Sequence, residues 1–138
     1  MDMNTILTDP KSVNPAEYDG KTGADLDIHL KNADFFDIKK YPTSQFDITK
    51  VEKMTSASAD KSNPEATHTI SGNLKIKDKT VNVTFPAKVS VTENGLSLES
   101  KFSIKRQDWG LTYVAEGNPK DWIIAPEIDF ELNISAVK

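Results

Sequence analysis

The feature that most constrains this chain is a strict alternation of apolar and polar residues between Val81 and Val91. Valines, Phe85 and Ala87 occupy every second position, and mostly polar side chains stand between them. Successive residues of a strand point to opposite faces of a sheet, so this period predicts a strand with one apolar face and one solvated face. The same period returns over residues 68–76, 96–104 and 128–136.

A sheet built from such strands must bury its apolar face. The sequence offers few long helical patterns that would cover it, so the strands must cover one another. Two all-β architectures meet this requirement, namely a sandwich of two sheets or a single antiparallel sheet curled into a barrel with an apolar interior.

The remaining elements are shorter. Residues 1–7 read as a short strand or the tail of one, and residues 8–23 have the proline and glycine content of a loop. The spacing of apolar residues predicts one short helix over residues 24–32, with Asp25 or Thr22 available to cap its start. Further strands are expected over residues 44–55 and 127–137.

Two local signals refine the strand pattern. Asn94-Gly95 predicts a tight hairpin, because Asn and Gly both accept a positive φ. Pro86 has no N–H to donate to a neighbouring strand, so the long strand that contains it is expected to be an edge or to be bulged at that point.

Composition limits the function. The 138 residues carry a net charge of −4 and fit one domain spanning residues 1–138. This acidic balance argues against a nucleic-acid partner, since phosphates require a basic surface. There is no cysteine, and the sequence contains neither a signal peptide nor an apolar run long enough to span a membrane.

No catalytic or metal-binding set can be assembled from the residues. The two histidines are far apart in sequence, and no serine lies in a nucleophile elbow. Asp34 and Asp37 flank a Phe-Phe pair and are better explained as turn-capping residues than as an acid–base pair. We therefore expect a protein that is not an enzyme and that has no metal site.

A more specific cluster lies between Phe102 and Tyr113. Arg106 is followed by Asp108, Trp109 and Gly110, which places a cation, an amphipathic ring and a sharp turn at the end of a strand. One interpretation is a structural corner in which Arg106 pairs with Asp108 or with an acid of the helical region. The other is the mouth of a cavity, where these groups meet the polar end of a ligand.

At this point the sequence resembles the YceI-like family of polyisoprenoid-binding proteins. The residues that carry the resemblance occur in the family's order: His29 to Asp37 with Tyr41-Pro42 and Phe46, Ile70 to Leu74, Val83 to Ala87, and Phe102, Ile104, Arg106, Asp108 to Gly110 and Tyr113. The resemblance implies a lipocalin-like antiparallel barrel, or a strongly curled sheet, with one short helix. It also implies a non-enzymatic role in carrying or sequestering a polyisoprenoid or an isoprenoid quinone, commonly in the periplasm after export.

The beginning of the chain departs from the family pattern. Family sequences usually open with further strands before the position of Met1, so the resemblance implies an N-terminally truncated domain with an incomplete barrel. Open strand edges and uncovered apolar faces favour association. We therefore expect a two-fold homodimer formed through edges or faces; the alternative is a fragment that aggregates or exchanges strands.

These expectations assign residues to a ligand-binding interior and its mouth. The side chains expected to face the interior are Phe46, Ile48, Ile70, Leu74, Val83, Phe85, Val89, Leu98, Phe102, Ile104, Phe130 and Leu132. Those expected at the mouth are Arg106, Trp109, Tyr113, Phe35, Phe36 and Tyr41. An interior filled by Phe46, Phe85, Phe102 and Phe130 would instead favour a packed structural or interaction module, whereas a continuous cavity would favour a carrier.

Overall fold

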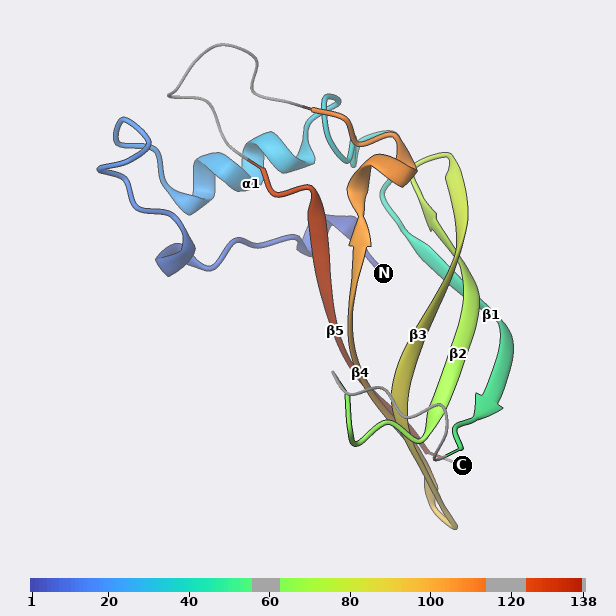
Figure 1. Cartoon of the computed structure of the whole chain (residues 1–138). Coiled ribbons are helices and arrows are strands. Elements are labelled where there is room, and N and C mark those ends of the chain that lie inside the picture. Colours follow the sequence, from blue (N-terminus) through green and yellow to red (C-terminus); the bar gives the residue numbers. More distant parts are fainter. Residues whose placement is uncertain (56–62, 114–123, 138) are drawn as a thin grey trace. The chain divides into compact units, whose positions relative to one another are not determined.

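A computed structural model describes residues 1–55, 63–113 and 124–137 of the chain. Within these residues one α-helix and five strands form, together with three short 3-10 helices (Figure 1). The elements are α1 (Gly23–Lys31), β1 (Gln45–Lys53), β2 (His68–Ile76), β3 (Lys79–Thr92), β4 (Gly95–Lys105) and β5 (Glu127–Val137), with 3-10 helices at Met3–Thr5, Pro10–Ser12 and Arg106–Trp109.

The chain divides into two compact units. The helical unit comprises Met1–Gln45, Lys75–Thr80 and Arg106–Pro126, and the sheet unit comprises Phe46–Leu74, Val81–Lys105 and Glu127–Lys138. Each unit has its own buried side chains, such as Phe35 in the helical unit and Phe85 in the sheet unit.

The sheet has the strand order β1-β2-β3-β4-β5, so every strand lies beside its neighbours in sequence. The pairs β3–β4 and β4–β5 are antiparallel. This confirms the predicted all-β antiparallel class with one short helix. Among the described strands the sheet is not closed, and β1 and β5 form its two edges.

Strand pairing converts the sequence alternation into apolar rows that cross β3, β4 and β5. The register sets Val91 beside Leu96, and Leu96 beside Ala136. Further along the sheet Phe102 lies beside Phe130, and Ile104 beside Ile128. The side chains at these positions share one face of the sheet, which we call the apolar face.

The pairing of β3 with β4 stops near Pro86. Its last pair is Lys88 with Glu99, whereas the β4–β5 ladder continues to Lys105 and Glu127. In continuous register Pro86 would face Lys101, where it has no N–H to offer. The Pro86 carbonyl instead accepts a hydrogen bond of 2.7 Å from the Ser100 hydroxyl. The interruption expected from the proline is therefore present in the β3–β4 ladder.

The hairpin predicted at Asn94-Gly95 forms, but for a different reason. The turn residues are Glu93 and Asn94, and neither Asn94 nor Gly95 has a positive φ. Gly95 is already the first residue of β4 and pairs with Val137. A Cβ at Gly95 would collide with the carbonyl oxygen of Ala136, so glycine is required by the close approach of β5.

Two other sequence expectations are wrong. Met1–Leu7 is not a strand: Met3–Thr5 is a 3-10 helix, and one isolated bridge joins Asp2 to Thr43. The Asp2 carboxylate accepts a hydrogen bond from the Asn4 N–H, which stabilises the helical turn instead of an extended chain. Ile48 does not face a covered interior, because it lies on edge strand β1 and remains 57% exposed.

The predicted helix is confirmed with bounds shifted by one residue. Thr22 and Asp25 form a capping box at its start, and the backbone N–H of Thr22 donates to the Asp25 carboxylate at 2.7 Å. That hydrogen bond is the main cause of the lowered pKa of Asp25. The buried Asp27 carboxylate accepts hydrogen bonds from the N–H and hydroxyl of Thr8, which fixes the preceding loop against α1.

Gly72 provides the slot that lets a ring of β1 lie across β2. A Cβ at Gly72 would stand 2.3 Å from the ring of Phe46 and 2.7 Å from the carbonyl oxygen of Asp47. We expect Gly72→Ala to lower the free energy of unfolding by about 1–3 kcal/mol, because both the ring and the β1 backbone must move. Urea denaturation measures this, and Gly23→Ala is the control because a Cβ there would meet its nearest atom, Cγ2 of Thr8, at an ordinary contact distance of 3.4 Å. An unchanged midpoint for Gly72→Ala would contradict the slot.

Candidate functional site

Four phenylalanine rings form a ladder across the sheet. Phe46 of β1 contacts Phe85 of β3 at a centroid distance of 5.6 Å. Phe85 stacks on Phe102 of β4 at 4.1 Å, and Phe102 stacks on Phe130 of β5 at 5.1 Å, with ring planes parallel within 6°. The ladder forms because the β4–β5 register makes Phe102 and Phe130 direct partners and because Gly72 leaves room for Phe46.

The apolar face is covered unevenly. Ile70, Phe85, Ala87 and Leu98 form a buried cluster, against which Phe46, Val83, Val89, Phe102 and Leu132 pack while remaining partly exposed. Exposure increases toward β5 and toward the β3–β4 turn, where Ile134 is 48% and Val91 71% exposed. The ladder is therefore core at Phe85, and its β5 end, Phe102 and Phe130, offers apolar surface to a ligand or partner.

A groove of about 850 Å³ lies over β4 and β5 on the polar face of the sheet, opposite the ladder. Its walls are polar-face side chains of β4 and β5 and the β3 residues on either side of Ala87, and the intervening residues of β4 and β5 form its floor. The lining residues are Asn63, Glu65, Pro86, Lys88, Glu99, Ser100, Lys101, Phe102, Ser103, Asp129, Phe130, Glu131, Leu132 and Asn133. Charged and hydroxyl side chains form its walls, so the groove suits a polar molecule, and the exposed rings on the other face are a separate apolar surface.

The charged lining groups are held mostly in pairs. Lys88 contacts Glu65 at 2.9 Å, and Lys101 contacts Glu131 at 3.2 Å. The hydrogen bond and charge of Lys88 lower the pKa of Glu65, and Glu65, followed by Glu99, raises the pKa of Lys88. The Ser103 hydroxyl donates to the Asp129 carboxylate. The rim is thus a set of solvated pairs and not an exposed charge of one sign.

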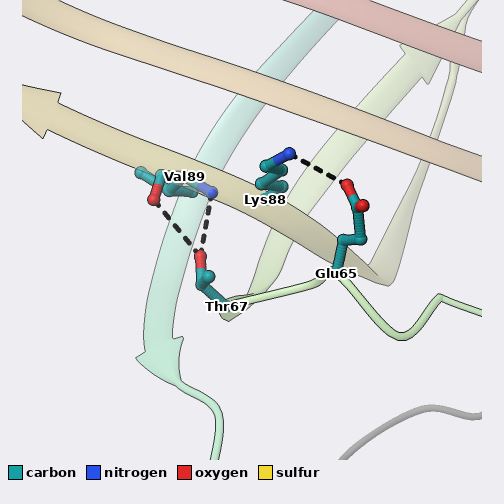
Figure 2. Close-up of polar contacts among 4 residues, drawn as sticks. All are labelled: Glu65, Thr67, Lys88 and Val89. Carbon is teal, nitrogen blue, oxygen red and sulfur yellow. Dashed lines mark hydrogen bonds and ion pairs between the residues drawn. The ribbon is translucent and has the colours of Figure 1, made fainter.

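Thr67 fixes the segment that carries Glu65 onto β3. Figure 2 shows its hydroxyl between the two backbone groups of Val89, accepting from the N–H at 2.9 Å and donating to the carbonyl at 3.3 Å. The Thr67 N–H also donates to the Ala87 carbonyl at 2.9 Å. These bonds position Glu65 for its contact with Lys88 at the wall of the groove.

The residues predicted to face the interior are buried, partly buried or, in one case, exposed. Ile70, Leu74, Phe85, Leu98 and Ile104 are buried. Phe46, Val83, Val89, Phe102, Phe130 and Leu132 are partly buried, and Ile48 is exposed. Among them Phe102, Phe130 and Leu132 belong to the strand segments that form the floor of the groove, and their side chains lie on the opposite, apolar face. A ligand contact for any of these residues stays a prediction.

The residues predicted at a mouth belong to the helical unit. Phe35, Arg106 and Trp109 are buried there, whereas Phe36, Tyr41 and Tyr113 are partly buried. Phe35 stacks edge-on against Phe36 at 4.7 Å, and His29 contacts Tyr113 at 4.5 Å. These contacts describe an aromatic cluster around α1, and a role for it at a ligand's entry stays a prediction.

Arg106 is the centre of a corner. Its guanidinium donates to the main-chain carbonyls of Leu111, Ala125 and Ile124 and lies 5.8 Å from the Phe35 ring centroid. Among the described residues its partners are carbonyl oxygens, and not Asp108 or an acid of the helical region as the corner interpretation expected. The guanidinium bonds to carbonyls of two segments, Leu111 and residues 124–125, that both lie against it. This favours the structural corner over the mouth of a cavity.

Sequence reasoning missed three contributors to the site. Gly72 lies in the alternating segment 68–76 and in the stretch that resembles the family, but its close contact with Phe46 depends on strand order. Ser100 lies on the apolar face, and its hydroxyl donates to the Pro86 carbonyl. The proline could have indicated this contact, because it interrupts the strand pairing and leaves a carbonyl that requires another donor. Glu65 lies outside every periodic segment, and no local pattern indicates that it meets Lys88.

Within the described residues there is no group of three or more His, Cys, Asp or Glu side chains placed to hold a metal ion. None of the helices in this part of the chain has the length and apolar character needed to cross a membrane. The available chemistry is therefore apolar contact along the ladder on one face of the sheet, and hydrogen bonding and ion pairing in the groove on the other face.

Known structures share this fold. The YceI protein of Campylobacter jejuni is 21% identical with a TM-score of 0.62, and the match covers 83% of this chain and 63% of that one. BcnA of Burkholderia cenocepacia is 20% identical with a TM-score of 0.62, over 82% of this chain and 64% of that one. This chain thus spans less than two thirds of the length of these structures. Among curated proteins, no sequence matches it significantly. The family model of the YceI-like domain matches residues 1–136, and the chain therefore belongs to the YceI-like family.

Proposed function

We propose that this protein binds a long apolar molecule, a polyisoprenoid or an isoprenoid quinone, along the exposed end of its phenylalanine ladder. The YceI-like family is a family of binding proteins. The observation that carries the proposal is the pairing of Phe102 and Phe130, which are stacked and remain partly exposed at the β5 end of the apolar face.

Apolar burial supplies enough free energy for such binding without special chemistry. Each CH₂ group removed from water contributes about 0.8 kcal/mol, so an isoprenoid tail gains affinity with every unit that it lays against the rings. A polar head group stays in solvent beyond the exposed end of the ladder. In this proposal the protein carries or sequesters the ligand, has no other cofactor, and acts in the periplasm or after secretion.

Ligand binding is tested directly on the purified chain. Organic extraction followed by mass spectrometry detects an apolar molecule retained from cells, and native mass spectrometry after addition of menaquinone detects one bound afterwards. We expect a stoichiometric complex in at least one of these two experiments. The absence of a complex in both would contradict the proposal.

Phe130 offers a variant that separates binding from folding. It is partly exposed and contacts one ring of the ladder, so Phe130→Ala should change the free energy of unfolding by only about 1 kcal/mol. If menaquinone lies on the ladder, its affinity falls by about tenfold, since the variant removes the outermost ring. Ile48→Ala is the control because Ile48 is exposed on β1. Equal affinity for both variants would contradict the ladder as the binding surface.

A second candidate is a structural or interaction module that binds no ligand. The specific observation in its favour is that Phe46, Phe85, Phe102 and Phe130 contact one another and so fill part of the apolar face themselves. This candidate predicts that Phe102→Ala and Phe130→Ala both cost several kcal/mol of stability, as in a packed core, and that neither variant alters menaquinone binding.

A further inference from the structure

Two segments of the helical unit form a basic surface. Residues 37–41 follow α1, and residues 75–79 span the turn between β2 and β3; both segments belong to this unit. Contact with Tyr41 is the main cause of the raised pKa of Lys40, and the charge of Asp78 in the other segment also raises it, so the two segments lie near each other. The lysines of these segments, which we call the lysine patch, are Lys39, Lys40, Lys75, Lys77 and Lys79.

The charge of the patch is opposite to that of the chain. Residues 37–41 and 75–79 contain five lysines and two aspartates and so carry a net charge of +3, whereas the whole chain carries −4. Lys77 is half-buried and the other four lysines are exposed. Within the part of the chain that the structure describes, the three ion pairs involve none of these lysines. The patch is therefore free to meet an anionic partner.

The backbone at Lys77 supplies a second, independent observation. Its φ is 56°, in the left-handed region that glycine adopts without steric cost and that a lysine rarely occupies. Glycine would form this turn with less strain, yet the turn carries a cation. Strained backbone conformations concentrate at functional sites, where the structure around them maintains the strain. The charge at this turn is therefore better explained by an interaction than by folding.

We propose that the lysine patch docks the protein on an anionic lipid membrane, with lipid phosphate groups as the partners of the lysines. Screening limits exposed charges to a range of about 8 Å at physiological ionic strength, so a lipid surface at the patch responds to its local positive charge and little to distant acids.

Tyr41 favours a lipid surface over other polyanions. Its ring is partly exposed, and the Lys40 ammonium lies 5.1 Å from the ring centroid, so an amphipathic ring and a cation stand together as they do at membrane interfaces. A nucleic acid suits the chain less, since it requires a longer basic stripe and a less acidic protein. The inference goes beyond the proposed function and does not depend on it, because none of these residues belongs to the ladder.

Lys77→Gly separates docking from folding. Glycine accepts the positive φ, so this variant should unfold at the same urea concentration as wild type or a higher one. Its affinity for vesicles that contain phosphatidylglycerol should fall about fivefold, because it removes one lysine from the anionic surface. Lys39→Gln should cause a similar loss. Lys50→Gln is the matched control, since Lys50 lies on β1 in the sheet unit and its charge is paired with Glu52 at 2.8 Å.

Co-sedimentation of the whole chain, without menaquinone, with phosphatidylcholine vesicles measures docking in the presence and absence of phosphatidylglycerol. We expect binding only to the vesicles with phosphatidylglycerol, and weaker binding as the salt concentration rises. Equal binding to both kinds of vesicle, binding to neither, or equal losses for Lys39→Gln and Lys50→Gln would overturn the inference. So would binding of duplex DNA through the same lysines without any binding of vesicles. A chain that docks on the vesicles but binds no menaquinone would support this inference and contradict only the proposed function.

Discussion

Replacing Phe85 by alanine lowers the free energy of unfolding by about 3–5 kcal/mol, the range seen for a large ring removed from a packed core. Phe85 is only 2% exposed and has ring partners on two sides, Phe46 at 5.6 Å and Phe102 at 4.1 Å. Its removal loses the transfer free energy of the ring, two aromatic contacts and the support that Ile70 and Leu98 receive in the same cluster. Urea denaturation followed by far-UV circular dichroism measures the loss.

The stability lost when a ring is replaced by alanine should depend on the position of that ring in the ladder, so the other rings serve as controls. Phe102 and Phe130 are partly exposed, so alanine at either site leaves a surface that water can wet instead of a closed cavity. The cost should therefore decrease in the order Phe85, Phe102, Phe130. If Phe130→Ala costs as much as Phe85→Ala, the β5 end of the ladder is covered in solution, and a ligand or a second chain must cover it.

Much of the sheet could be predicted because its alternation is a local property. The face on which Phe85, Leu98 and Ile104 lie follows from a period of two, whatever their neighbours are. Ile48 shows what local alternation cannot predict: it has the correct parity, but its exposure depends on whether another strand lies beyond β1. That is a property of strand order, which no window of the sequence contains.

The site depended even more on contacts distant in sequence. Each ring of the ladder was predicted to face the apolar side, yet their stacking depends on the register that sets Phe102 against Phe130 and on the space above Gly72. Hairpin signals constrain register only near a turn. The β4–β5 register joins strands separated by more than twenty residues, so it follows from packing and not from any local signal.

The same distinction explains Arg106. The sequence identified it as a significant residue, because an arginine before Asp108, Trp109 and Gly110 at a strand end is unusual for a solvated surface. Its partners could not be identified, since they are main-chain carbonyls on a segment that follows about twenty residues later. Carbonyl oxygens have no side-chain signature in a sequence. A carboxylate partner was expected only because acids are visible there.

Arg106→Met should lower the free energy of unfolding by about 3–5 kcal/mol. Methionine keeps much of the aliphatic volume but leaves the buried carbonyl of Leu111 and the partly buried carbonyls of Ala125 and Ile124 without their donors. An acceptor that loses its partner costs about 1–3 kcal/mol where water does not reach it, so the Leu111 carbonyl contributes most. Arg106 is 4% exposed, so water does not readily replace the guanidinium. Thermal and urea denaturation measure the change, with Lys105→Met as the control because Lys105 is exposed.

Arg106→Lys separates charge from geometry at this corner. A single ammonium on a flexible stem cannot span three carbonyls that the planar guanidinium reaches from different nitrogens, so lysine should recover only a minor part of the lost stability. If charge alone mattered, lysine would be nearly equivalent to arginine. If Arg106 instead served chiefly to hold the polar end of a ligand, Arg106→Met would leave the ligand-free protein as stable as wild type within about 1 kcal/mol and would weaken menaquinone binding. The three carbonyl contacts predict a different outcome. Arg106→Met should lose stability even without ligand, and its folded fraction should keep the menaquinone affinity of wild type.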